Sequence, residues 1–430
     1  MLSIVLFCVL GMALLLNFPV AIALGISVLI TIITVPGAPP ISSLISSMIS
    51  LSDSFTLIAV PLFVLAGEVM QTGGLSKRLV NLAFHLVGKV RAGMAYVNIL
   101  ASMFFAAISG SAPATVAAVG SNLIPQMHTL GYKKDFSSAL TASSGMIGVL
   151  IPPSIPMIVY GVSANVSIGA LFLAGIVPGI LLGILFAITS RIIIGKSLDN
   201  HESRNLSADL IKESTISVFK NAFWALLTPL IILGGIYGGV FTPTEAGAVA
   251  VVYAIIISIF VYKELTLKQL YDLLFSSAKV SARILSLVLF SIAFGRLVTI
   301  AEVPQQVAMA LQSVSDNPII IIAMLNLLLL IVGMFMETIA AIIILTPILL
   351  PVAVAAGVGP LSFGVIMTVN LAIGFCTPPL GVNLFVASSV SKVSVNQISK
   401  AILPFGFSML IVLLITSYFP ESFLFLVNLL

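Results

Sequence analysis

Residues 106–125 read AAISGSAPATVAAVGSNLIP and lie between long apolar runs. The segment holds Ser109-Gly110-Ser111 at its start and prolines at positions 113 and 125, so polar and helix-breaking residues interrupt an otherwise lipid-compatible chain. Backbone groups that leave a helix cannot face hydrocarbon, because each unsatisfied N–H or C=O is costly there. The segment therefore predicts a turn that lies within a membrane protein and is buried in protein.

The composition indicates an integral membrane protein with many spans. Of the 430 residues, 60% are hydrophobic and 7% are charged, against about 25% charged in a typical soluble domain. Residues 2–35 are expected to form one retained span with a kink at Pro19. No soluble domain fits between the apolar runs, since the longest polar stretch, 195–220, is only a connector. Runs near the roughly 20 residues needed to cross a bilayer occur at 2–35, 54–72, 168–194, 221–241, 246–262 and 401–420.

The basic residues suggest how the chain is threaded. Lys and Arg gather in connectors, and cytoplasmic connectors carry the excess of these residues. Residues 92–127 begin and end beside such connectors, which predicts a re-entrant hairpin that enters from the cytoplasm. Residues 318–356 are flanked by AEVPQQ and AAGVGP, which contain no Lys or Arg, so a second hairpin is expected to enter from outside. The N-terminus is then cytoplasmic, the C-terminus is periplasmic, and Arg296 is the only basic residue near the outer side.

An internal repeat supports this threading. A shift of 226 positions superimposes Pro125 on Pro351, Gly148 on Gly374 and Pro152-Pro153 on Pro378-Pro379, and a shift of 228 pairs Gly67 with Gly295. Because the basic residues give the two copies opposite orientations, an inverted-topology repeat is expected, as in many secondary transporters. The expected divisions are an N-terminal membrane helix with an outer loop (1–50), a first repeat with hairpin 92–127 (51–195), a connector with two scaffold helices (196–265), and a second repeat with hairpin 318–356 (266–430).

Four breaks in the helices are expected to meet near the middle of the membrane. Helix N-termini at such breaks attract anions, while unwound carbonyl groups suit a hard cation such as sodium. Any one break is more often a packing feature or a harmless kink, but four at matched positions favour a binding site. They lie at 109–111, 148–153, 333–338 and 374–379.

Five motifs resemble the large membrane subunit of the tripartite ATP-independent periplasmic (TRAP) transporters. In chain order they are ISGSAPATVAAVGS, LIPPSIPMIVYG, GIYGGVFTPTEAGAVAVVYA, GMFMETIAAIIILTPILLP and CTPPLGVNLFVASS. The resemblance implies an all-α carrier of the bacterial inner membrane that imports an organic acid anion by an elevator movement. It also implies coupling to two or more sodium ions, a small four-helix membrane subunit, and a periplasmic binding protein that delivers the substrate.

The resemblance further implies two sodium sites, held by backbone and hydroxyl oxygens. The first site would use Ser109, Ser111, Gly145, Val149 and Pro152. The second would use Gly333, Thr338, Gly374 and Thr377. Candidates for the substrate path are Ser154, Asn383, Glu337 and Arg296.

Acidic residues in apolar segments are functional candidates by default. Glu337 is expected to act near the second cation site or to fix the hairpin tip, Glu68 to cap or pair near the end of its span, and Glu245 to cap a helix. Walker A, GxSxG and HExxH sequences are all missing, which argues against ATP-driven transport and against an enzyme. A channel subunit remains the alternative, because re-entrant hairpins also build pores.

Overall fold

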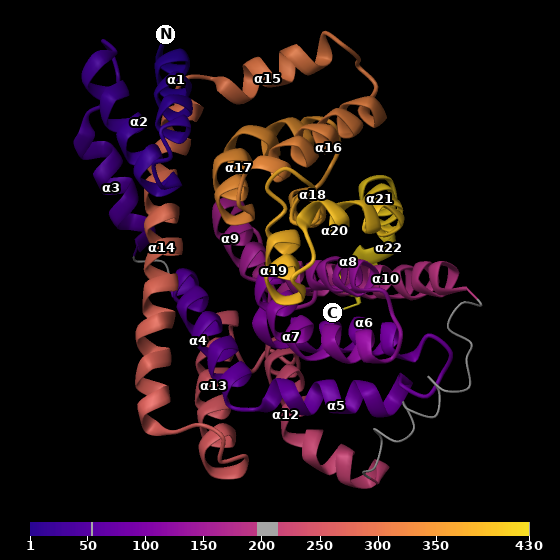
Figure 1. Ribbon diagram of the computed structural model, residues 1–430. Helices are drawn as coiled ribbons and strands as arrows, with labels where there is room; N and C mark the ends of the chain where they lie inside the picture. The colour runs from indigo at the N-terminus through magenta and orange to yellow at the C-terminus, as the bar shows by residue number, and fades with distance from the viewer. Residues whose placement is uncertain (53–54, 196–213, 430) are drawn as a thin grey trace.

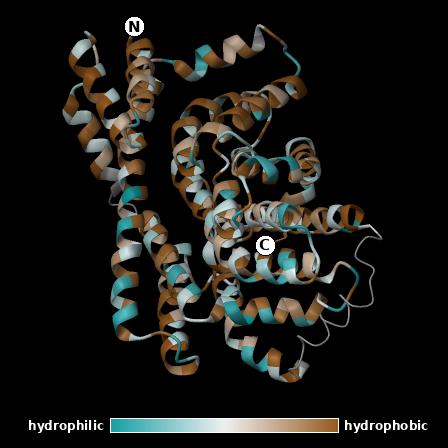
Figure 2. Cartoon of the chain, viewed as in Figure 1, coloured by the Kyte–Doolittle hydropathy of each residue, from teal (hydrophilic) through white to brown (hydrophobic). Residues whose placement is uncertain are grey.

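The structure is a computed structural model that describes residues 1–52, 55–195 and 214–429. These residues form helices and connecting turns without strands, which confirms the expected all-α class (Figure 1). Seven of the described helices are long and apolar enough to cross a membrane, or eight if the bent pair at 395–418 counts as one span. Apolar side chains dominate most helices, with polar patches in α5 (Leu75–Val87) and along part of α14 (Leu267–Ile300) (Figure 2). The chain is therefore a polytopic membrane protein.

The N-terminal segment differs from the expected single kinked span. Residues 2–35 form two helices, α1 (Leu2–Leu15) and α2 (Val20–Thr34), which pack side by side and are followed by α3 (Ile41–Ser52) (Figure 1). Asn17 adopts a left-handed conformation with φ 61°, which asparagine tolerates better than most residues. Pro19 then precedes the first residue of α2. The Asn-Phe-Pro sequence thus makes a turn where we expected a kink, because the residue before proline disfavours helix.

Helix α4 (Ala59–Thr72) follows the short helix η1 (Phe55–Ile58) and packs against α13 and α14, in a group of helices that we call the scaffold. The start of α13 carries a capping box between Thr242 and Glu245, so the expected capping role of Glu245 is confirmed. The remaining members of the group are α12 (Thr215–Tyr237), α13 (Pro243–Ile256), the π-helical turn η3 (Ile257–Val261), α14 and α15 (Val303–Gln312). Residues 196–213 of the expected connector lie outside the described residues.

Two runs of helices share one order. The first contains α5, a hairpin, a helix that ends in a break, and a second helix after Pro152-Pro153. The second run repeats the hairpin, the break and the helix after Pro378-Pro379, and both of these peptide bonds are cis. The first run is α5, α6 (Gly93–Ser109), α7 (Ala112–Thr129), α8 (Lys134–Gly145), η2 (Met146–Val149), α9 (Ile155–Ala164) and α10 (Ile168–Ile194). The second run is α16 (Pro318–Phe335), α17 (Thr338–Ala355), α18 (Pro360–Gly374), α19 (Val382–Ser391), α20 (Val395–Ala401), α21 (Leu403–Tyr418) and α22 (Glu421–Asn428).

The two helix pairs match the expected hairpin limits closely. The first occupies 93–129 and the second 318–355. Each arm of the second pair has 18 residues and is long and apolar enough to cross a bilayer. The shift of 226 also pairs Pro178 with Pro404, but the two prolines occupy different positions in their helices. Pro178 lies inside α10, whereas Pro404 lies at the start of α21, beside a 57° bend.

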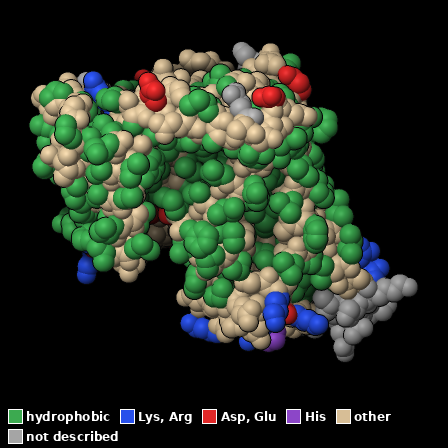
Figure 3. All heavy atoms as spheres, turned by 90° about the horizontal axis from the view of Figure 1, so that it is seen from above, with side chains coloured by type: hydrophobic (Ala, Val, Ile, Leu, Met, Phe, Trp, Pro, Cys, Tyr) green, Lys and Arg blue, Asp and Glu red, His purple; other side chains and the backbone are tan. Residues whose placement is uncertain are grey.

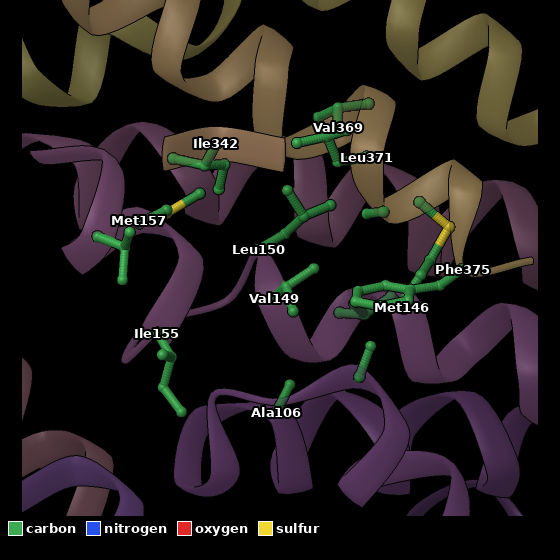
Figure 4. Close-up of a cluster of buried hydrophobic side chains, with 14 of the residues drawn as sticks. Ala106, Met146, Val149, Leu150, Ile155, Met157, Ile342, Val369, Leu371 and Phe375 are labelled. Carbon is green, nitrogen blue, oxygen red and sulfur yellow. The ribbon is translucent and has the colours of Figure 1, made fainter. Parts of the chain in front are cut away.

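The two runs interlock instead of forming separate bodies. Helix α17 packs on α9, and α19 packs on α7 and α8. Hydrogen bonds also cross between the runs: Tyr160 Oη donates to Pro360 O at 2.7 Å, and the hydroxyls of Thr189 and Ser408 are 2.7 Å apart. In Figure 4, Val149 and Leu150 of the first break lie between Ala106 of α6 and Leu371 of α18, within one continuous apolar core.

The surface also suits a lipid environment. Hydrophobic side chains cover most of the face seen in Figure 3, with acidic groups near one edge and most of the visible Lys and Arg near the opposite edge. Large apolar side chains such as Ile192, Phe260 and Phe407 are exposed along several helices. An apolar band between charged edges is the pattern expected of a membrane-embedded surface.

Candidate functional site

A small cavity lies where the four breaks meet. Its volume is about 110 Å³. Each tip and each break supplies part of its wall, so segments more than 200 residues apart in the sequence face one another across it. The wall consists of Gly110, Ser111, Ala112, Pro113, Val149, Ile155, Pro156, Glu337, Ile339, Phe375 and Val382.

The first hairpin tip turns at Gly110, which ends α6 with a left-handed φ of 60°. The carbonyl of Ser111 accepts two hydrogen bonds from Thr115, one from its N–H at 3.1 Å and one from Oγ1 at 2.8 Å. The hydroxyls of Ser109 and Thr115 are 3.2 Å apart. The tip thus concentrates hydroxyl and carbonyl oxygens within one turn of the chain.

The first break lies directly against this tip. The N–H of Ile155 donates to the carbonyl of Gly110 at 3.4 Å. A Cβ placed on Gly148 would lie 2.9 Å from Ser111 O and 2.6 Å from Thr115 Oγ1, so only glycine allows this approach. Gly145, Val149 and Pro152 are buried in the same region. The structure therefore brings together the five residues expected at the first cation site.

The second hairpin tip is organised by Glu337. This residue caps α17, with its Oε2 accepting the N–H of Ala340 at 3.1 Å. Glu337 is also the only ionisable residue in the wall of the cavity. Thr338 follows it as the first, buried residue of α17. One carboxyl group therefore both caps the helix at the tip and lines the cavity.

The second break touches its tip as closely as the first does. Gly333, in the last turn of α16, packs against Gly374, the last residue of α18. The N–H of Leu380 donates to Met334 O at 3.1 Å. Thr377 Oγ1 donates to Ile373 O at 2.8 Å and lies on the same short segment. The four residues expected at the second cation site thus lie on two backbone segments in contact.

Asn383 links the second break to the first run of helices. Its Nδ2 donates to Ala142 O on α8 at 3.0 Å, and Cys376 Sγ donates to the same carbonyl at 3.3 Å. The side chain is fully buried, and its Oδ1 has no hydrogen-bond partner among the described residues. Asn383 is not part of the cavity wall. Its free acceptor nevertheless makes it the least satisfied of the expected substrate-path residues.

Ser154 and Arg296, both expected on the substrate path, lie outside the cavity wall. Ser154 Oγ donates to Val149 O at 2.6 Å and accepts the N–H of Met157 at 3.3 Å, so its hydroxyl caps α9. Arg296 lies on α14 and donates to Ser43 O at 3.0 Å and to the hydroxyl of Ser47, both on α3. Neither residue belongs to the cavity wall.

Glu68 binds the long helix α14. Its Oε2 accepts a hydrogen bond from Ser277 Oγ at 2.7 Å and another from the hydroxyl of Ser276. Among the described residues the only ion pair is that between Arg78 and Glu264, so Glu68 is paired through hydroxyl groups alone. The shift of 228 that relates Gly67 to Gly295 also relates Glu68 to Arg296. Both charged residues therefore attach a scaffold helix to its neighbour at equivalent positions.

Sequence reasoning missed Thr115, whose hydroxyl binds both sides of the first tip. Its position four residues after Ser111 was a usable signal, because a threonine hydroxyl often bonds the carbonyl one helical turn earlier. It also missed Phe375 and Val382, apolar wall residues that carry no signal in the sequence.

The metal-donor atoms expected at the two cation sites are all oxygens. The described residues contain no group of three or more His, Cys, Asp or Glu side chains that could hold a metal ion. The atoms present are carbonyl, hydroxyl and carboxylate oxygens, which are the donors that hard cations prefer.

Comparisons with known proteins identify the family of this chain. A family model described as the tripartite ATP-independent periplasmic transporter, DctM component, matches residues 6–422. The isethionate TRAP transporter permease DctMQ of Oleidesulfovibrio alaskensis is 48% identical over 420 residues, covering 97% of this chain, and this chain spans 65% of that protein.

Two further relatives are matched over most of their length. The C4-dicarboxylate TRAP transporter large permease DctM of Pseudomonas aeruginosa is 39% identical, with 94% of each chain covered. The sialic acid TRAP transporter large permease SiaM of Vibrio cholerae is 40% identical, with 86% of this chain and 85% of that protein covered.

A solved structure extends the agreement to the fold. The crystal structure of the Alcanivorax borkumensis YdaH transporter matches with a TM-score of 0.63 at 14% identity, covering 89% of this chain and 88% of that one. Because the family model matches residues 6–422, this chain belongs to the DctM family, the large permease component of the TRAP transporters.

Proposed function

We propose that this large permease subunit is a sodium-coupled secondary transporter that imports an organic acid anion through the cavity between the four breaks. The observation that carries the proposal is that both hairpin tips and both breaks border one cavity of about 110 Å³. A site built from two halves of one chain can be exposed alternately to each side of the membrane.

The substrate class follows from the relatives. Their names specify isethionate, C4-dicarboxylates and sialic acid, which share an acidic group on a small polar skeleton. This chain is expected to take an anion of that kind, including related sugar acids and keto acids. Ser111 and Ala112, at the start of α7, lie in the cavity wall, and the N–H groups of a helix start favour an anion.

Sodium coupling is supported by the neutral oxygen atoms at both tips. The first ion would be held around Ser109, Ser111, Gly145, Val149 and Pro152. Each sodium ion that enters contributes about 2.3 kcal/mol per 100 mV of membrane potential. Two or more ions can therefore offset the repulsion that an anion meets on entering a negative cytoplasm. The second ion would be held around Gly333, Thr338, Gly374 and Thr377.

An elevator movement is the mechanism we favour. In this scheme the hairpins and broken helices move together with the substrate, while the scaffold helices remain fixed in the membrane. The hairpins and broken helices of the expected repeats, 51–195 and 266–430, would form the moving unit, and the scaffold, which includes α4 and α14 as well as helices from 196–265, the fixed unit. The interlocked packing of α17 on α9 and of α19 on α7 supports a common moving body.

We place the protein in the bacterial inner membrane, with the basic connectors in the cytoplasm and the C-terminus in the periplasm.

The proposed side of the N-terminus differs from the one expected from the sequence, because α1 and α2 form a hairpin. Phe7 on α1 packs on Phe294 with ring centres 5.6 Å apart, and Ser43 on α3, which follows α2, binds Arg296, so both contacts lie near the outer end of α14. We therefore place the N-terminus in the periplasm instead of the cytoplasm.

Cysteine labelling tests this placement. Ser3→Cys, in a Cys8→Ser background, is expected to react with a membrane-impermeant maleimide from the periplasmic side. Lys89→Cys provides the cytoplasmic comparison. Labelling of Ser3→Cys only after the cells are permeabilised would return the N-terminus to the cytoplasm.

Two partners complete the proposed transporter: a small four-helix membrane subunit and a periplasmic binding protein that delivers the anion. The family description as a tripartite transporter supports this requirement. This chain spans only 65% of the isethionate permease.

Reconstitution tests the function and separates it from a channel. The chain, its small subunit and candidate binding proteins are placed in proteoliposomes, and uptake of isethionate, succinate and sialic acid is measured with and without a sodium gradient. A carrier gives saturable uptake that needs both sodium and the binding protein. Unsaturable conductance without either would favour the alternative, an ion or anion channel subunit.

A further inference from the structure

A second cavity lies away from the transport site, between α5 and α12. Its volume is about 210 Å³. It shares no lining residue with the cavity between the breaks. The lining is mostly polar and charged, and consists of Lys77, Arg78, Asn81, Val218, Asn221 and Glu264.

Arg78 is fixed in this cavity by three contacts. Its Nη1 donates to Gly74 O at 2.8 Å and to Glu264 Oε1 at 2.8 Å, and its guanidinium lies 3.6 Å from the ring centre of Tyr262. Glu264 therefore already balances the charge of Arg78. Among the described residues Lys77 forms no ion pair, so the cavity retains about one unit of positive charge.

The surroundings place this cavity at the level of lipid headgroups. Below it, Leu82, Val218 and Ala222 form a small apolar cluster between the same two helices. On α12, Phe219, Phe223 and Trp224 are 44%, 51% and 39% exposed. Tryptophan is enriched at the membrane–water boundary. Asn221 is exposed and lies one helical turn from Trp224, so we place the opening of the cavity at that boundary.

We propose that this cavity binds the phosphodiester group of a phospholipid headgroup. The Lys77 ammonium would pair with the phosphate, while the side-chain amides of Asn81 and Asn221 donate hydrogen bonds to its oxygens. A phosphodiester carries one negative charge and matches the unbalanced charge of the cavity. Its acyl chains would lie along the apolar, exposed surface of α12. Basic pockets between membrane helices on the cytoplasmic side are suited to such headgroups.

The binding experiment uses the full chain in dodecyl maltoside and dioctanoyl phosphatidylglycerol as the probe. Trp224 is the only tryptophan of the chain and lies one turn from Asn221, so its fluorescence reports binding. Lys77→Gln is expected to weaken binding about fivefold. Asn221→Leu, which removes the amide donor without changing the charge, is expected to weaken it as well. Lys89→Gln removes an exposed charge outside the cavity and is the matched control.

Two further probes identify the source of the phosphate. Dioctanoylglycerol, which lacks the phosphate, is expected to leave the fluorescence unchanged, and inorganic phosphate is expected to compete only weakly. Equal weakening by Lys89→Gln and Lys77→Gln would overturn the proposal in favour of diffuse attraction. Binding of inorganic phosphate as tight as that of the lipid would overturn it in favour of a soluble anion.

Discussion

Gly333 and Gly374 lie with their backbones in direct contact, where the second hairpin meets the second break. A Cβ added to Gly374 would lie 2.3 Å from Gly333 O and 2.7 Å from its Cα. No side chain can move away to relieve such a clash, since the opposing atoms belong to the main chain. The first half has the equivalent contact between Gly148 and the carbonyl of Ser111. The two tips therefore depend on glycine at the same repeat position.

Gly374→Ala is expected to displace the second tip and to raise the sodium concentration for half-maximal uptake about tenfold or more. Overpacking of this kind also costs about 1–3 kcal/mol of stability. The control is Gly406→Ala on α21, where an added Cβ meets nothing within 4 Å. Sodium-dependent uptake in proteoliposomes and thermal unfolding measure both effects. An unchanged sodium dependence in Gly374→Ala would contradict the placement of the second ion.

Ser109→Val and Thr377→Val test the hydroxyl groups at the two cation sites. Each variant removes one hydroxyl without adding charge, so sodium affinity is expected to fall while the protein still folds. Thr416→Val is the matched control, because Thr416 is buried and its hydroxyl donates to Val412 O in the same i−4 pattern. Titration of uptake against sodium is the measurement. If both variants keep the wild-type sodium dependence, the two sites are misassigned.

Glu337 caps α17 and lines the cavity, and Glu337→Gln separates capping from the proposed role in sodium binding. Glutamine keeps an oxygen that can accept the N–H of Ala340, so the tip is expected to remain capped and the melting temperature nearly unchanged. Loss of the charge is expected to reduce sodium affinity. Glu337→Ala also removes the cap and should cost about 1 kcal/mol more. Equal sodium affinity in wild type and Glu337→Gln would restrict this residue to capping.

Glu68→Leu leaves the hydroxyls of Ser276 and Ser277 without their acceptor between α4 and α14. Loss of hydrogen bonds to a charged group costs about 1.5–3 kcal/mol, so the melting temperature should fall by several degrees. Glu68→Gln keeps an acceptor and should recover most of the loss. Thermal unfolding in detergent checks this, with Glu245→Gln as a control at a helix cap far from α14. A melting temperature as low for Glu68→Gln as for Glu68→Leu would show that the charge itself is needed.

The local pattern of residues predicted most of the framework of this protein. Runs of apolar residues near 20 in length require buried or lipid-facing helices, so the all-α membrane class followed from composition alone. The helix pairs 93–129 and 318–355 turn near Gly110 and Glu337, where a glycine and a carboxyl group interrupt an apolar run. The shift of 226 positions that pairs Gly148 with Gly374 can likewise be found from the order of residues along the chain alone.

Only the tertiary structure decided which groups meet. The side-by-side packing of α1 and α2 turned an expected kink into a hairpin and changed the proposed side of the N-terminus. The hydrogen bond from Asn383 to Ala142 O joins residues 241 positions apart, and no local pattern encodes that contact. Arg296 binds α3 for the same reason, since the position of a long charged side chain is set by the acceptors that packing brings near it. Sequence determines where this backbone bends, whereas packing of the two halves determines what the bends enclose.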